Sequence, residues 1–151
     1  MKQFKRTFWR LGFAVAVLFA SATFAPAQTI RNGDFDESIS WWFAFGGGNV
    51  SETDTGYQSE SACLVSRRGE SWHGAAQDIQ EIFEPGQDYH IEAYIRPEPG
   101  KAGTMRVRVY QSDDRGDRVV EIGEAECLAD QWTRIQGGFT YDPNGDVGRS
   151  I

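Results

Sequence analysis

Residues 89–96, YHIEAYIR, alternate between two kinds of side chain: Tyr, Ile, Ala and Ile at the odd positions, and His, Glu, Tyr and Arg at the even ones. Successive side chains of an extended strand point to opposite faces, so this period of two predicts a β-strand with one face on a core and one in water. Residues 104–110, TMRVRVY, repeat the pattern, with Met105, Val107 and Val109 opposite Arg106, Arg108 and Tyr110. Both stretches favour antiparallel sheets over buried parallel strands.

The rest of the chain continues the same pattern more weakly. Further strands are predicted at 62–66, 77–83, 118–123 and 132–141, separated by the turn sequences EPGQD, PEPGKAG, DDRGD and DPNGD. No segment keeps a helical spacing of apolar residues over three turns. The sequence therefore predicts an all-β fold, an antiparallel β-sandwich or jelly roll of about eight strands.

The N-terminal segment is typical of a secretory signal peptide. Four basic residues up to Arg10 precede the apolar run LGFAVAVLFASATF (11–24), and Ala25-Pro26-Ala27 follows it. The run is too short to span a bilayer. We therefore expect residues 1–27 to be removed and residues 28–151 to form one exported domain.

The charge of the chain excludes two classes of partner. Removal of residues 1–27 changes the formal net charge from −7 to −11, because that segment holds four basic residues and no acidic one. An acidic surface repels phosphate backbones and anionic lipid headgroups. We expect no nucleic-acid or membrane partner, and a neutral ligand fits this charge.

Two cysteines, Cys63 and Cys127, are present in a chain that is expected to be exported. Disulfides persist in that environment. The residues alone leave open whether these two are paired or are small buried thiols.

The residues nominate no catalytic centre. Motifs for a nucleophilic serine, a zinc protease helix or a phosphate-binding loop are missing from the sequence, and no pair of its 22 acidic residues is singled out as a glycosidase pair. The run SDDRGDRVVE (112–121) has its glycine too early for a calcium-binding helix–loop–helix and favours a hairpin. We expect no catalysis within this chain.

The tryptophans carry the remaining information. At most one of Trp41 and Trp42 can face a core if their segment is extended, and Trp132 is expected to close one end of the sandwich. Trp72 follows the polar run RRGES (67–71) without a nearby apolar pattern. From the residues alone, burial under a loop and display on the surface are both open for Trp72.

Five sequence elements occur in an order that resembles a known family. They are NGDFD (32–36), Trp42, CLVSRRGESWHGAAQDI (63–79), EPGQDYHIEAYIRP (84–97) and DQWTRIQGGFTY (130–141). In this order, and with the R-x-x-x-W-x-G core at Arg68, Trp72 and Gly74, the chain resembles the xylanase-associated carbohydrate-binding modules of family 22, with relatives in families 4 and 9. The resemblance extends from about residue 30 to residue 141.

The resemblance implies a jelly roll of the galactose-binding-like kind and a noncatalytic function. Such modules bind β-linked plant polysaccharide, xylan or mixed-linkage β-glucan, as monomeric appendages of secreted glycoside hydrolases such as endo-xylanases. It places Trp72 under a sugar ring, with candidate hydroxyl partners at Arg68, His73, Tyr94, Arg108, Tyr110 and Glu121. The alternative is an exported adhesion or structural sandwich without a sugar cleft.

The chain also departs from the family pattern. A cleft arginine of the family falls near Phe45 here, and a cleft tyrosine falls near Val119. Asp34 and Asp36 match the early half of a structural calcium site, and the alternative is that both are solvated residues of an entry strand. Family members continue beyond the position of Ile151, so we expect the last strand or strands of the sandwich to be missing. We also expect that the chain is a gene fragment or that it folds poorly alone.

Overall fold

The computed structural model describes residues 30–143 and 149–151. The predicted signal peptide and most of the predicted DPNGD turn lie outside these residues. Within them the chain forms strands and turns, and no helix there is long and apolar enough to cross a bilayer. The strands are β1 (Trp42–Phe45), β2 (Asn49–Thr53), β3 (Ala62–Ser66), β4 (Gly74–Gln77), β5 (Gln87–Ile95), β6 (Gly103–Asp113), β7 (Gly116–Cys127), β8 (Thr133–Tyr141) and β9 (Arg149–Ser150).

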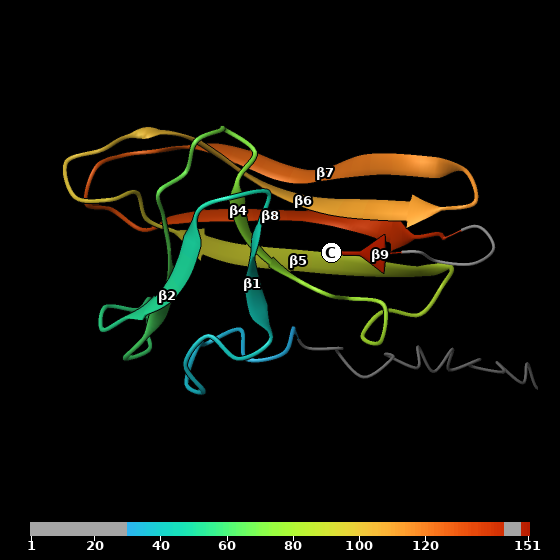
Figure 1. The fold of residues 1–151 in the computed structure, drawn as a ribbon, viewed down its shortest axis with the longest axis horizontal. Coiled ribbons are helices and arrows are strands. Elements are labelled where there is room, and N and C mark those ends of the chain that lie inside the picture. The colour runs from blue at the N-terminus through green and yellow to red at the C-terminus, as the bar shows by residue number, and fades with distance from the viewer. Residues whose placement is uncertain (1–29, 144–148) are drawn as a thin grey trace, which may run out of the picture.

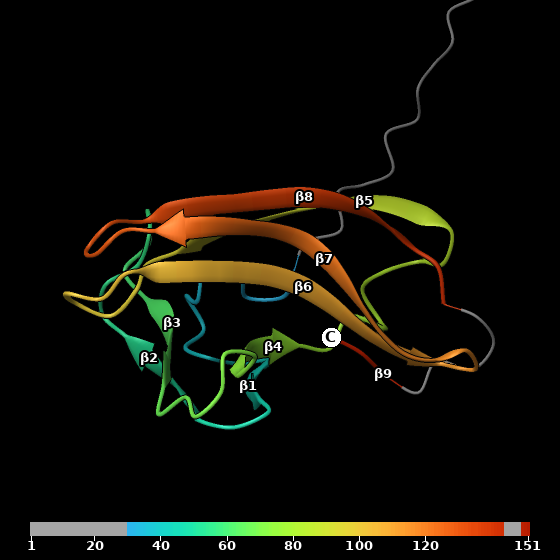
Figure 2. The same cartoon turned by 90° about the horizontal axis from the view of Figure 1, so that it is seen from above.

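The strands form two layers, and every strand pair is antiparallel. The long strands β5, β8, β7 and β6 lie together in one layer, and the short pairs β1–β4 and β2–β3 lie across from them (Figures 1 and 2). The predicted all-β sandwich is therefore confirmed. The two strands with the clearest alternation, residues 89–96 and 104–110, fall within β5 and β6.

The core lies between the layers and takes one face of each long strand. Its buried members are contributed by β6, β7, β8 and the segment after β4: Val109, Ile122, Tyr141, Ile79, Ile82 and Phe83. Tyr89, Ile91 and Val107 pack against this cluster, so the faces predicted for β5 and β6 are confirmed. The opposite faces of these strands carry their charged residues.

The strand predicted at residues 77–83 is wrong in its position. β4 ends at Gln77, and the amides of Ile82 and Phe83 both donate to the carbonyl of Ile79, at 3.0 Å, in a tight turn. Ile79, Ile82 and Phe83 have the i, i+3, i+4 spacing of one helical turn, which points all three into the core. This local spacing, rather than alternation, decides the backbone there.

The hairpin between β6 and β7 confirms the prediction made for residues 112–121. Asp113 pairs with Gly116 across a two-residue turn, and the carboxylate of Asp113 accepts a hydrogen bond from the amide of Arg115 at 2.8 Å. The same carboxylate forms ion pairs with the guanidinium groups of Arg115 and Arg118. These contacts commit Asp113 to the turn.

Strand β9 joins the two layers. The amide of Ile151 donates to Tyr110 at 3.0 Å, the amide of Tyr110 donates to Ile151 at 2.7 Å, and the amide of Ile79 donates to Ser150 at 2.9 Å. From Gly103 to Val109, the edge of β6 away from β7 has no strand partner within the described residues. That further strands are missing stays a prediction.

The two cysteines are free thiols in the structure. Cys63 lies on β3, where burial raises the pKa of its thiol. Cys127 ends β7 and is buried. Of the two states that the sequence left open, the structure has the reduced one.

Strands β7 and β8 approach each other closely beside a bulge. The register between β6 and β7 shifts after Val107, so that Ile122 has no partner on β6. A Cβ atom on Gly137 of β8 would lie 1.9 Å from the carbonyl oxygen of Ile122. The two strands can therefore lie side by side only with glycine at position 137.

We predict that Gly137→Ala lowers the free energy of unfolding by about 1–3 kcal/mol, because the added methyl group must push the two strands apart. Gly103→Ala is the matched control, since a Cβ at Gly103, also within a strand, meets nothing within 4 Å. Urea unfolding measures both. Equal stability of the two variants would contradict the close approach.

The outer face of β5 and β8 carries a cross-strand ion pair. Arg134 donates to the carboxylate of Glu92 through Nε, at 2.7 Å, and also through Nη2. The hydrogen bond from Arg134 lowers the pKa of Glu92, with a smaller effect from Tyr94. Glu92 therefore binds its proton less readily in the folded chain than in the unfolded one.

This lowered pKa predicts a pH-dependent contribution to stability. The pair stabilises the fold fully above the unfolded pKa of glutamate, about 4.3, and the contribution is lost as the pH falls through the lower folded pKa. Thermal melts of the parent chain and of Glu92→Gln should differ at pH 6 and converge at pH 2–3. A difference in melting temperature that stays constant over this range would contradict the assignment.

Candidate functional site

Trp72 lies in the loop that leads into β4, and 51% of its surface is exposed. Its ring makes a T-shaped contact with Phe45 of β1 at a centroid distance of 6.0 Å and another with His73 at 4.5 Å. The indole is therefore held by its neighbours and still open to solvent. Of the two states that the sequence left open for Trp72, the structure shows display.

The indole rests on the glycine triplet that follows β1. A Cβ atom on Gly46 would lie 2.1 Å from Cζ3 of Trp72, and one on Gly47 would lie 2.7 Å from Cε1 of His73. Gly46 also has a φ of +80°, a backbone conformation that residues other than glycine rarely adopt. The rings of Trp72 and His73 thus pack directly on the backbone of this triplet. A residue larger than glycine at position 46 or 47 would overlap with them.

Hydrogen bonds fix the loop that carries Trp72. Arg68 Nη2 donates to the carbonyl of Ser71 at 2.8 Å, and the amide of Gly69 donates to Nδ1 of His73 at 3.2 Å. A neutral imidazole that accepts through Nδ1 carries its proton on Nε2. Nε2 of His73 is therefore the donor that this ring can offer to a ligand beside Trp72, whereas Arg68 serves the loop itself.

Tyr110 extends the row of rings along the sheet. Its ring centroid lies 5.8 Å from that of Phe45, so Trp72, Phe45 and Tyr110 form a continuous row that we call the aromatic strip. Phe45 pairs with Gly74 and points to the face opposite that of its neighbour Ala44, which pairs with Ala75. Phe45 was not predicted as a site residue, although WWFAFGGG places a ring directly before the glycine seat.

Arg108 and Glu121 are paired with each other. They are direct partners in the register of β6 and β7, and Arg108 Nε and Nη2 both lie 3.3 Å from the carboxylate of Glu121. Arg108 shares a strand face with Tyr110, two residues along β6. The pair is thus a polar border on the β6 side of the aromatic strip.

Tyr94 belongs to a different cluster. Its ring stacks on Tyr57 at 3.7 Å, Tyr57 lies 5.9 Å from Trp132, and the guanidinium of Arg96 covers Trp132 at 4.9 Å. A hydrogen bond with Glu92 is the main cause that raises the pKa of Tyr94. The structure therefore places Tyr94 among rings that cover one another, and not beside the aromatic strip.

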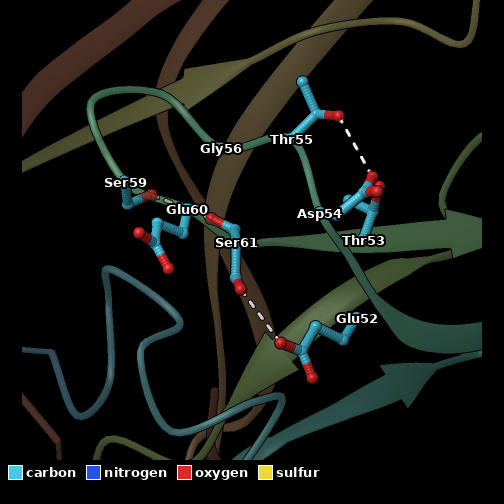
Figure 3. A pocket seen from close by; sticks show the side chains of 8 residues that line it. All are labelled: Glu52, Thr53, Asp54, Thr55, Gly56, Ser59, Glu60 and Ser61. Carbon is cyan, nitrogen blue, oxygen red and sulfur yellow. Dashed lines mark hydrogen bonds between the residues drawn. The ribbon is translucent and has the colours of Figure 1, made fainter.

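A hollow lies in the loop between β2 and β3, away from the aromatic strip (Figure 3). Its side chains bond one another: Ser61 donates to Glu52 at 2.9 Å, and Thr55 donates to Asp54 at 3.3 Å. Hydrogen bonds from Ser38 and Ser61 lower the pKa of Glu52. The hollow is lined by hydroxyl and carboxylate groups without an aromatic ring, and so offers nothing for stacking.

Asp34 and Asp36 lie in the exposed turn that precedes β1. The amide of Asp36 approaches the carboxylate of Asp34 at 3.5 Å. Calcium takes about six to eight oxygen ligands. No group of three or more histidine, cysteine or acidic side chains within residues 30–143 and 149–151 is placed to hold a metal. The two aspartates fit half of a site at most, and calcium binding stays a prediction.

Comparison with known proteins places this chain in one family. A family model described as "Carbohydrate binding domain" matches residues 27–149. Endo-1,4-beta-xylanase 2 of Arabidopsis thaliana is 26% identical over 120 residues, which are 78% of this chain and 11% of that protein. Endo-1,4-beta-xylanase A of Thermoanaerobacterium saccharolyticum is 24% identical over 127 residues, 82% of this chain and 10% of that protein. The chain thus spans about a tenth of the curated relatives it matches.

Solved structures with the same fold are similar to this chain over most of its length. The CBM22-2 xylan-binding domain from Paenibacillus barcinonensis Xyn10C has a TM-score of 0.68 and 17% identity, covering 78% of this chain and 77% of that domain. A tandem CBM22-1–CBM22-2 structure from the same protein has a TM-score of 0.69 and 20% identity, covering 75% of this chain and 37% of the tandem. The resemblance to family 22 modules is confirmed.

We predict that Gly46→Ala tilts or lifts the indole of Trp72, because the new methyl group overlaps with its ring. Near-ultraviolet circular dichroism, which reports on the packing of aromatic rings, should change. Gly100→Ala is the matched control: Gly100 also has a positive φ, +72°, but a Cβ there meets nothing within 4 Å. The same spectrum from both variants would show that the ring does not rest on Gly46.

Proposed function

Because this chain belongs to the carbohydrate binding domain family, we propose that its function is to bind a β-linked polysaccharide through Trp72. The observation that carries the proposal is an indole with half of its surface exposed, seated on glycine backbone and wedged between Phe45 and His73. The face of a pyranose ring is lined with C–H bonds and packs on an indole, while its hydroxyl groups need polar partners. His73, beside the indole, and Tyr110, in the same aromatic strip, are the candidates.

The proposed ligand is xylan, with mixed-linkage β-glucan as the second candidate. The names of the matching structures, which include xylan-binding domains, and the xylanase names of the relatives support this choice. A neutral polymer also fits the acidic net charge of the chain. Arg108 and Glu121 would border such a ligand, whereas Arg68 would act by holding the loop.

We infer that the chain does not itself cleave the polymer, and that it is part of a longer glycoside hydrolase. The match to only about a tenth of two endo-xylanases supports this reading. A binding module of this kind raises the local concentration of its enzyme on the polymer. Export through the segment 1–27 and action as a monomer are part of the same proposal.

Affinity electrophoresis through gels that contain oat-spelt xylan tests the proposal. The parent chain should be retarded, and Trp72→Ala should bind more than about tenfold more weakly, because a central aromatic side chain usually carries much of the binding energy. Leu128→Ala is the matched control, since Leu128 is 57% exposed and lies outside the site.

Unretarded migration of the parent chain would favour the alternative, an adhesion or structural sandwich. Retardation that Trp72→Ala leaves unchanged would show that the polymer binds elsewhere. Release of reducing sugar from xylan by the parent chain, which we do not expect, would contradict its assignment as a noncatalytic module.

A further inference from the structure

A second tryptophan is displayed on this chain. Trp41 has 58% of its surface exposed, more than Trp72, and its φ is +74°. A bulky side chain in this left-handed region is uncommon and unfavourable, and glycine or asparagine would adopt the same backbone more easily. Neither the strain nor the exposure contributes to a core. Strained residues of this kind cluster at binding and catalytic sites.

The adjacent Trp42 is held in place by defined contacts, so the exposure of Trp41 does not come from a disordered segment. The indole nitrogen of Trp42 donates to the carbonyl of Asn32 at 3.1 Å, and its ring packs against Phe35 at 5.3 Å. The Asn32 side chain in turn donates to the carbonyls of Ser38 and Ser40. The turn that ends at Trp41 is thus closed by hydrogen bonds, and its last residue points outward.

A chain of contacts that starts in the protein interior holds the ring of Trp41. Gln77 is only 5% exposed. Its side-chain Nε2 donates to the backbone carbonyl of Arg31 at 2.7 Å, and its Oε1 accepts from the backbone amide of Arg31 at 2.8 Å. The guanidinium of Arg31 then lies 4.7 Å from the centroid of the Trp41 ring and 3.0 Å from Glu81. A cation over one face fixes the ring and leaves its other side for a ligand.

The two displayed indoles lie at opposite ends of one strand. Trp41 directly precedes β1, and Trp72 rests on Gly46, directly after β1. Five residues separate the two points, and the strand between them is extended, so they lie at most about 17 Å apart along the chain. We expect a short oligosaccharide on Trp72 not to reach Trp41, whereas a polymer offers further sugar units to both.

We propose that Trp41, backed by Arg31, is a second saccharide contact that takes a pyranose unit of the same β-linked polymer. This inference rests on the proposed function. It predicts that long polysaccharide gains affinity from two linked contacts, while short oligosaccharide binds only at Trp72.

The experiment compares Trp41→Asn with the parent chain and with Trp72→Ala. Asparagine accepts the positive φ, so the variant should melt no lower than the parent chain. Retardation by oat-spelt xylan should weaken about two- to tenfold, the range of one aromatic contact. Binding of xylotriose, measured by calorimetry, should stay unchanged in Trp41→Asn and be lost in Trp72→Ala.

Each other outcome has one meaning. Unchanged xylan retardation of Trp41→Asn, with retardation lost in Trp72→Ala, overturns the second contact and leaves the proposed function intact. Equal loss of xylotriose and xylan binding in Trp41→Asn overturns it too, because the two indoles would then share one site. A parent chain that xylan does not retard overturns the proposed function and this inference together.

Discussion

The indole of Trp72 lies so close to the backbone of Gly46 that one added methyl group would overlap with its ring. A tryptophan is usually buried among apolar side chains, because exposing its large apolar surface to water costs free energy. Here the ring rests on peptide backbone and makes T-shaped contacts with Phe45 and His73, and half of its surface stays in water. A flat and open apolar surface results, fixed in direction before any ligand arrives. Such preorganisation lowers the entropy lost on binding.

The sandwich supplies the frame for this contact. The register between β1 and β4 places Phe45 opposite Gly74, so no side chain projects from the sheet beside the ring of Phe45. Strand β6 brings Tyr110 to the other side of Phe45, although the two residues are far apart in sequence. The described tryptophans then divide into two kinds. Trp42 and Trp132 are half-buried within the fold, whereas Trp41 and Trp72 are exposed. Arg31 lies over the ring of Trp41, and Gly46, Phe45 and His73 contact that of Trp72.

The parts of this structure that follow from local sequence were predictable. Alternation in β5 and β6 predicted which faces enter the core, because the period of a strand is a property of a few neighbouring residues. The segment 77–83 was misassigned, since its three large apolar residues also fit one helical turn and tertiary packing chose the turn. Alternation correctly predicted that Tyr94 lies on the polar face, but it could not predict which residues contact its ring. Tyr57, which covers its ring, comes from a loop whose path depends on the whole fold. The role of Phe45 and Gly46 also depends on contacts between distant segments.

The central claim is that a sugar lies on the exposed ring of Trp72. Its most direct test is a titration of the chain with xylotriose, observed through the indole N–H resonances in a ¹H–¹⁵N correlation spectrum. We predict a progressive shift of the Trp72 resonance, with those of Trp42 and Trp132 unchanged, because these two half-buried rings already pack against protein. A Trp72 resonance that stays in place while another indole moves, or while calorimetry records binding, would contradict it.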